Sequence, residues 1–183
     1  MQSAAYIALL RGINVGGKNM LPMRDLTRMF DGAGCADVRT YIQSGNVVFT
    51  ATPACAKRLA DDVATAVEKR FGFRPGVVLR TADEIAKVAA NNPLIGEGAD
   101  IRLLHVAFLA EKPDARRAAA LDPARSPGDV FNVRGREVYL YLANGAGKTR
   151  RSNAYLESKL GTTSTMRNWR TVLKLSEMAQ QLR

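Results

Sequence analysis

The order of strand and helix patterns constrains the fold of this chain more than any other feature. Residues 4–10 are continuously apolar, which is typical of a strand buried on both faces. A helical pattern, two β-branched runs, a long amphipathic pattern and a short apolar run at residues 77–79 then follow. This order, β-α-β-β-α-β, predicts the split βαβ arrangement of a ferredoxin-like fold.

Turn and capping residues separate these elements. The glycine-rich residues 11–19 predict a loop after the first strand, and residues 44–46 predict a tight hairpin between the two β-branched runs. Thr52 followed by Pro53 predicts the start of the long helix, and Gly72 predicts its end.

The same order begins again in the second half of the chain. The second half is predicted to contain a strand, a helix, a hairpin and two further helices, at residues 101–110, 113–121, 130–142, 150–159 and 168–182. We infer a pseudo-duplication whose second half ends in helix rather than in a strand. The predicted fold class is α+β, with a ferredoxin-like repeat at residues 1–80, a connecting helix and loop at 81–100, and a second ferredoxin-like (α/β-plait) repeat with an extra C-terminal helix at 101–183.

Net charge narrows the class of partner. The 183 residues include 27 Lys and Arg against 17 Asp and Glu, a formal charge of +10. Eight of the basic residues but only two of the acidic ones lie within residues 144–183. A basic balance indicates a polyanionic partner, so we expect nucleic acid or a phosphate-bearing small molecule, contacted in part through the C-terminal segment.

Segments that would target the chain elsewhere are not evident in the sequence. No apolar run approaches the roughly 20 residues that a membrane-spanning helix needs, and the N-terminus lacks a signal-peptide pattern. We therefore expect a cytoplasmic protein with no membrane partner. Cys35 and Cys55 lack metal-ligand spacing and are interpreted as small packing residues.

The loop after the first strand is one candidate binding site. It offers the cations Arg11 and Lys18 and the amides Asn14 and Asn19 beside three glycines, and a helix follows. Glycines let backbone N–H groups approach an anion, and a helix N-terminus favours negative charge. The alternative is a turn that needs positive φ angles and carries solvated charges.

The predicted hairpin turn is a second candidate. Gln43, Ser44 and Asn46 place two amides and a hydroxyl at the junction of two apolar strands, which is more than turn geometry requires. Turns also favour Ser, Gly and Asn for their backbone conformations, so a structural role remains the alternative.

The C-terminal segment supplies three further cations. Residues 144–149 resemble the end of a P-loop, but Leu142 stands where the motif requires its first glycine, so an ATPase is rejected. Lys148 and Arg151 remain candidate anion contacts at the start of the next helix. Arg167 could bind a phosphate beside Trp169, which we interpret as a core anchor.

The sequence gives little support to catalysis. The only histidine, His105, lies within an apolar strand and is interpreted as a satisfied sheet residue. No Ser-His-Asp, Cys-His or metal-ligand arrangement can be assembled, so we expect no metal ion and no cofactor.

Three stretches of the chain carry a resemblance to a known family. They are Tyr-Ile-Ala-Leu-Leu-Arg-Gly-Ile-Asn-Val-Gly-Gly-Lys-Asn at residues 6–19, Tyr-Ile-Gln-Ser-Gly-Asn-Val-Val-Phe at residues 41–49, and the closing motif at residues 165–175. Together they resemble an uncharacterised bacterial family, the domain of unknown function 1697. The resemblance implies two ferredoxin-like repeats and no assigned activity. The positions that match the family's signature are Arg11, Gly12, Asn14, Gly16, Gly17, Gln43, Ser44, Gly45, Asn46, Arg167, Asn168 and Trp169.

Three hypotheses for function follow. The leading one is a non-enzymatic binding protein for a phosphate-bearing ligand, nucleic acid above all. The second is a small-molecule enzyme, transferase-like with a nucleotide or acyl substrate, whose cleft lies around residues 11–19 and 43–46. The third is a structural or regulatory protein-interaction module.

Overall fold

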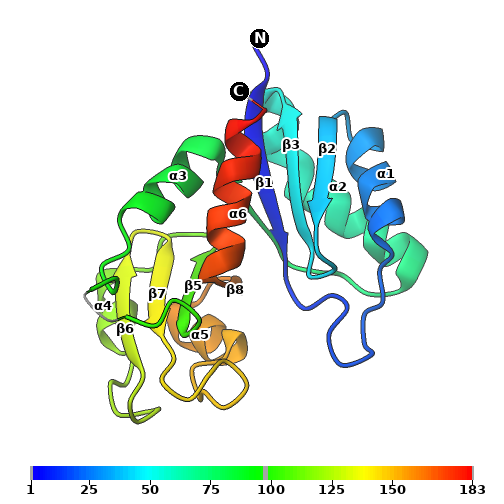
Figure 1. Cartoon of the computed structure of the whole chain (residues 1–183). Coiled ribbons are helices and arrows are strands. Elements are labelled where there is room, and N and C mark those ends of the chain that lie inside the picture. Colours follow the sequence, from blue (N-terminus) through cyan, green and yellow to red (C-terminus); the bar gives the residue numbers. More distant parts are fainter. Residues whose placement is uncertain (1, 97–98, 183) are drawn as a thin grey trace. The chain divides into compact units, whose positions relative to one another are not determined.

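Two similar series of elements make up the chain (Figure 1). The computed structural model describes residues 2–96 and 99–182. The first series is β1 (Ala4–Leu10), α1 (Met23–Gly32), β2 (Ala36–Tyr41), β3 (Asn46–Ala51), α2 (Pro53–Phe71), β4 (Val77–Thr81) and α3 (Ala82–Ala90). The second series is β5 (Leu104–Leu109), α4 (Ala115–Ala119), β6 (Val130–Arg134), β7 (Glu137–Tyr141), α5 (Asn153–Leu160), β8 (Ser164–Asn168) and α6 (Trp169–Gln180).

Each series forms a four-stranded antiparallel sheet. The strand order is β2-β3-β1-β4 in the first sheet and β6-β7-β5-β8 in the second. In both sheets the first and third strands of the series are central, which is the order of a ferredoxin-like fold. Within the first series, α1 and α2 lie on the same face of the sheet (Figure 1). The predicted α+β class with two ferredoxin-like repeats is confirmed.

The end of the second repeat was predicted wrongly. Residues 164–168 form the strand β8, which pairs antiparallel with β5 from Leu109↔Ser164 to His105↔Asn168. The sequence of β8 has no apolar alternation, and its hydroxyl residues resemble a helix cap. Pairing with β5 overrides that local preference, and Ser164 and Thr165 are buried in the sheet.

The register of the strands makes the two repeats comparable residue by residue. Tyr6 of β1 is paired with Thr81 of β4, and His105 of β5 is paired with Asn168 of β8. In both repeats a helix begins at the next residue, so α3 of the first repeat corresponds to α6 of the second. Thr81 and Asn168 both cap the helix that follows, by accepting a hydrogen bond from the backbone N–H three residues later.

The chain divides into two compact units. One contains the residues up to Val88 together with those from Lys174 onward, and the other runs from Ala89 to Leu173. None of the helices in the described part of the chain is long and apolar enough to cross a bilayer.

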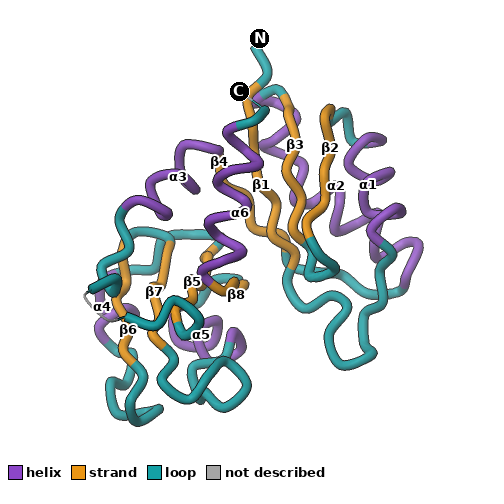
Figure 2. The backbone as a smooth tube through the Cα atoms, in the orientation of Figure 1, coloured by secondary structure: helices purple, strands orange, loops and turns teal. Residues whose placement is uncertain are grey.

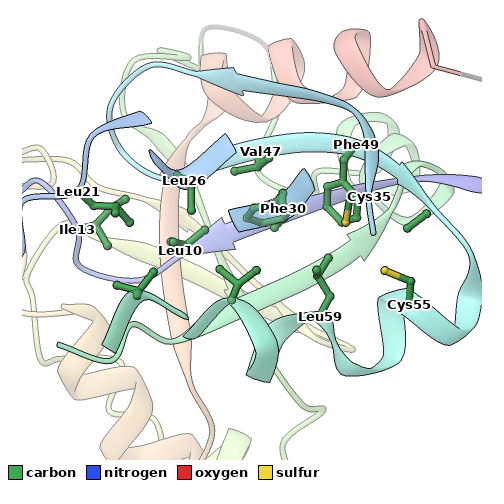
Figure 3. Close-up of a cluster of buried hydrophobic side chains, with 14 residues drawn as sticks. Leu10, Ile13, Leu21, Leu26, Phe30, Cys35, Val47, Phe49, Cys55 and Leu59 are labelled. Carbon is green, nitrogen blue, oxygen red and sulfur yellow. The ribbon is translucent and has the colours of Figure 1, made fainter. Parts of the chain in front are cut away.

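The core of the first unit extends into the loop that follows β1. Phe30 of α1 packs edge-on against Phe49 of β3, with the ring centroids 5.2 Å apart. Figure 3 shows Ile13 and Leu21, which lie in that loop, beside Leu10 in the same buried cluster. These two loop residues are almost completely buried, so the loop is anchored at both ends by apolar packing.

The two cysteines lie in this core, as predicted (Figure 3). The Cys55 thiol donates a hydrogen bond to the Ala33 carbonyl, at 3.3 Å. Burial first, and then the neighbouring Cys55, raise the pKa of the Cys35 thiol to about 12.

This pKa predicts a loss of stability at alkaline pH. The pKa of Cys35 is higher in the folded state than the value near 8.5 of an unfolded cysteine, so the neutral thiol contributes stability that is lost as pH rises from about 8.5 towards 12. We expect the free energy of unfolding to fall by up to roughly 1.4 kcal/mol per pH unit in this window. Urea denaturation between pH 8 and pH 11 measures it. The Cys35→Ala variant should show a shallower decline, and equal slopes for the two proteins would contradict the assignment.

Candidate functional site

The two candidate loops of the first repeat lie at the same end of the first sheet. β1 is antiparallel to β3, so the end of β1 lies beside the start of β3, with Leu9 paired with Asn46. The Leu10 N–H donates to the Gly45 carbonyl, and the Arg11 N–H donates to the Gly76 carbonyl, both at 2.8 Å. Figure 2 shows the long loop between β1 and α1 leaving this end of the sheet. The backbones of the two polar stretches therefore adjoin at this end of the sheet.

The tip of the long loop is a small hairpin. Val15 and Lys18 form an isolated antiparallel bridge, and the Lys18 N–H donates to the Val15 carbonyl at 3.1 Å. Gly16 and Gly17 have φ angles of 58° and 72°. A two-residue turn with positive φ at both positions is the type I′ turn, which explains why two glycines stand there.

The two asparagines of this loop hold its backbone in place. The Asn14 side chain donates to the carbonyls of Leu21 and Gln43, both at 2.9 Å, and accepts from the Leu21 N–H at 2.7 Å. The Asn19 side chain donates to the Gly12 carbonyl at 2.9 Å. Both residues have positive φ, a conformation that asparagine adopts more readily than most residues. Their amides therefore serve the loop and its attachment to the neighbouring turn.

The turn at residues 42–45 is held in a similar way. The Asn46 side chain is completely buried and donates to the Tyr41 carbonyl at 3.1 Å and to the Ser44 hydroxyl at 2.9 Å. Gly45 has a φ of 77°, and a Cβ atom there would lie 2.7 Å from the Leu10 Cβ. Gln43, by contrast, is exposed, and only its carbonyl is used by Asn14.

Three apolar side chains are exposed on these loops. Val15, Met20 and Ile42 are 65%, 59% and 52% exposed. Lys18 is also exposed and Arg11 is half-buried at the base of the loop. These three apolar residues were not predicted as site residues, because the polar composition of the two loops predicts contacts through amides and cations. The signal that could have found them is the presence of large aliphatic residues beside glycines in a predicted loop.

The C-terminal cations have different environments. Lys148 is exposed in the loop before α5. Arg151 is buried, donates to the carbonyls of Asp122 and Pro123 at 2.8 and 2.7 Å, and lies over the Phe131 ring at 4.4 Å. Its side chain stabilises the loop that precedes β6, and this burial does not favour contact with a ligand.

Arg167 is also buried, within β8. It donates to the Thr165 hydroxyl at 2.7 Å and to the Met166 carbonyl at 2.9 Å, and burial lowers its pKa to about 10.

Trp169 is buried as a core residue, as predicted. His105 is buried in β5, where its Nδ1 is bonded to the Leu103 carbonyl. No group of three or more potential metal ligands is present among the described residues.

A family model described as "Protein of unknown function (DUF1697)" matches residues 3–139. The chain belongs to this family. A solved structure, that of the conserved bacterial protein SP0830 from Streptococcus pneumoniae, is similar with a TM-score of 0.74 and 23% sequence identity. The similarity covers 97% of this chain and 99% of that one, and it supports the fold alone. No curated protein matches the chain.

The contacts of Gly45 predict that it cannot be replaced without loss of stability. We expect Gly45→Ala to lower the free energy of unfolding by roughly 1–3 kcal/mol, because the new Cβ is strained at positive φ and overlaps Leu10. Urea denaturation of the variant and the wild type measures this. Gly32→Ala at the end of α1 is the matched control, since a Cβ there meets no atom within 4 Å. The same midpoint for both variants would contradict the structural role of Gly45.

Proposed function

We propose that this protein binds nucleic acid through the hairpin and turn at the end of the first sheet, the surface formed by residues 11–20 and 42–45. The observation that carries the proposal is the exposure of Val15, Met20 and Ile42 on rigidly held loops, together with Lys18.

Three large aliphatic side chains that are exposed on neighbouring ordered loops favour contact with a partner. An apolar patch on a protein surface is typical of an interaction site, whereas the tip of a solvated loop is normally polar. The hydrogen bonds of Asn14 and Asn19 fix this loop, so its apolar side chains stay at the surface. Nucleic-acid-binding proteins use such side chains as wedges between bases, with isoleucine and methionine among them.

The charges select nucleic acid over an uncharged partner. The formal net charge of the chain is +10, and Lys18 forms no ion pair with any residue of the described part of the chain. A lysine next to an apolar wedge can contact a phosphate while the wedge contacts the bases.

The contacts give less support to an enzyme at this surface. A catalytic cleft would need the side chains of Lys18, Gln43, Ser44 and Asn46 to converge on a substrate. Asn46 instead is buried and is bonded to a backbone carbonyl and to Ser44. The amides of Asn14, Asn19 and Asn46 therefore maintain the shape of this surface, and the exposed side chains are left to make contacts.

Fluorescence anisotropy with labelled single-stranded RNA, single-stranded DNA and duplex DNA tests the proposal. We expect binding that weakens steeply with salt, because phosphate contacts release counterions. Lys18→Gln should weaken binding to every sequence and reduce the salt slope by about 1. Replacing Val15, Met20 and Ile42 together by serine should weaken binding by at least about tenfold, through lost apolar contact, and leave the salt slope unchanged.

Two matched variants control for charge and hydrophobicity. Lys57→Gln removes an exposed lysine from α2, and Val130→Ser removes an exposed aliphatic side chain from β6. Both should bind as the wild type does. Equal losses in Lys57→Gln and Lys18→Gln, or no binding of any of the three nucleic acids at low salt, would refute the proposal.

A further inference from the structure

The second unit contains a small pocket that is lined by cations. Its volume is about 250 Å³. Its lining comes from the turn before β5, the second residue of β5, the loop before α5 and the junction of β8 with α6. It consists of Ile101, Arg102, His105, Ala146, Asn168 and Arg170. A pocket with two guanidinium groups and one imidazole has the composition of a site for an oxyanion.

Arg102 is hydrogen-bonded to the neighbouring Asp100. The Asp100 carboxylate accepts from Arg102 Nε at 3.0 Å and from Nη2 at 2.7 Å, and also from the Arg102 backbone N–H at 2.9 Å. These hydrogen bonds, with a smaller contribution from the charge of Arg170, lower the pKa of Asp100 to about 2. A guanidinium has five N–H donors, and Asp100 uses those of one edge, so the remaining donors can bind a ligand. With Asp100 ionised, the two arginines leave the site with a net positive charge.

His105 also belongs to the lining, and its contacts define which ring nitrogen carries the proton. Its Nδ1 lies 3.1 Å from the Leu103 carbonyl, which can only accept, so Nδ1 carries the proton. Burial lowers the pKa of His105, which favours the neutral ring. Nε2 is then the nitrogen with the lone pair, and it accepts a hydrogen bond from a ligand rather than donating one.

The first repeat shows that the fold does not require these residues. The register places Tyr6 at the position of His105 and Thr81 at the position of Asn168. The second residue of α3 is Asp83, whereas the second residue of α6 is Arg170. One charge is thus reversed between two copies of the same β-α junction, and the cationic group belongs to the second repeat alone.

We propose that this pocket binds the phosphate group of a phosphate monoester. A phosphate monoester has a second pKa near 6, so at pH 6 about half of it carries one O–H and shares a single negative charge between its two other terminal oxygens. The oxygens can accept from Arg102 and Arg170, and the O–H can donate to His105 Nε2. A carboxylate or a sulfate has no such proton at this pH. The volume suits a phosphate on a small molecule or at the end of an oligonucleotide, and it is below the usual range for a larger ligand.

This site is independent of the nucleic-acid surface proposed above, because every residue of its lining belongs to the second unit. Phosphate binding in this pocket is therefore tested separately from nucleic-acid binding at the first sheet. His105 is the only histidine in the sequence, so one imidazole signal in the NMR spectrum of the tag-free protein reports on the pocket without assignment.

The experiment is a titration of that imidazole signal with inorganic phosphate at pH 6 and constant ionic strength. We expect a saturable shift with phosphate and with glycerol phosphate, and an affinity for sulfate and acetate that is at least about tenfold weaker, because these anions cannot donate to His105. A 5′-phosphorylated oligonucleotide and its 5′-hydroxyl counterpart distinguish a nucleic-acid end from a small-molecule phosphate as the source of the group.

Two variants of the lining test the assignment, and a variant of an exposed arginine outside it is the control. Arg170→Asp, which places the residue of the first repeat in the second, should abolish the shift, and Arg102→Gln should weaken phosphate binding by at least about tenfold. Arg150→Gln removes an exposed arginine outside the lining and should bind as the wild type does. A non-saturable shift with phosphate, an unchanged affinity in Arg170→Asp, or equal affinities for sulfate and phosphate would overturn the proposal.

Discussion

The pairing of β1 between β3 and β4 is the interaction on which the first unit depends. This pairing brings the end of β1 beside the start of β3, and it therefore joins two loops that are about thirty residues apart in the sequence, as the bond from Asn14 to Gln43 shows. The core continues past the end of the strand through Ile13 and Leu21, so the loop after β1 is an extension of the folded structure. A surface built in this way is preorganised, and little conformational entropy is lost when a partner binds.

The polar side chains of this protein fall into two groups: those that hydrogen-bond to the backbone and stabilise the fold, and those that are exposed to solvent. Asn14, Asn19 and Asn46 satisfy backbone groups where the chain turns sharply, and the buried Arg151 does the same for the loop before β6. Exposed groups such as Lys18 and Arg170 make no such contribution to the fold. Burial explains the roles of Asn46 and Arg151, because a buried polar group must be hydrogen-bonded inside the protein, whereas an exposed group such as Lys18 or Arg170 is solvated at little cost.

The sequence predicted much of the fold and less of the site. The predicted ends of α2 are confirmed, with Thr52 as its N-terminal cap and Gly72 as the glycine that ends it. The strand β8 was missed because its stability comes from pairing with β5, which is distant in sequence. Local sequence could identify the polar turns, but not which of their residues face inward, so the roles of Asn46 and Arg151 needed the structure. The pocket around His105 joins segments that are more than sixty residues apart, and only the topology brings them together.

The direct junction of β8 with α6 has a consequence for chain length. No loop residue separates the two elements, and Asn168 is both the last residue of the strand and the cap of the helix. An inserted residue would rotate every side chain of α6 by about 100° about the helix axis. We therefore expect that an insertion or a deletion at this junction, or at its counterpart at Thr81, would disrupt the packing of the helix that follows. Variation in length among related chains belongs instead in loops such as the one between β7 and α5, where added residues alter neither strand register nor helix phase.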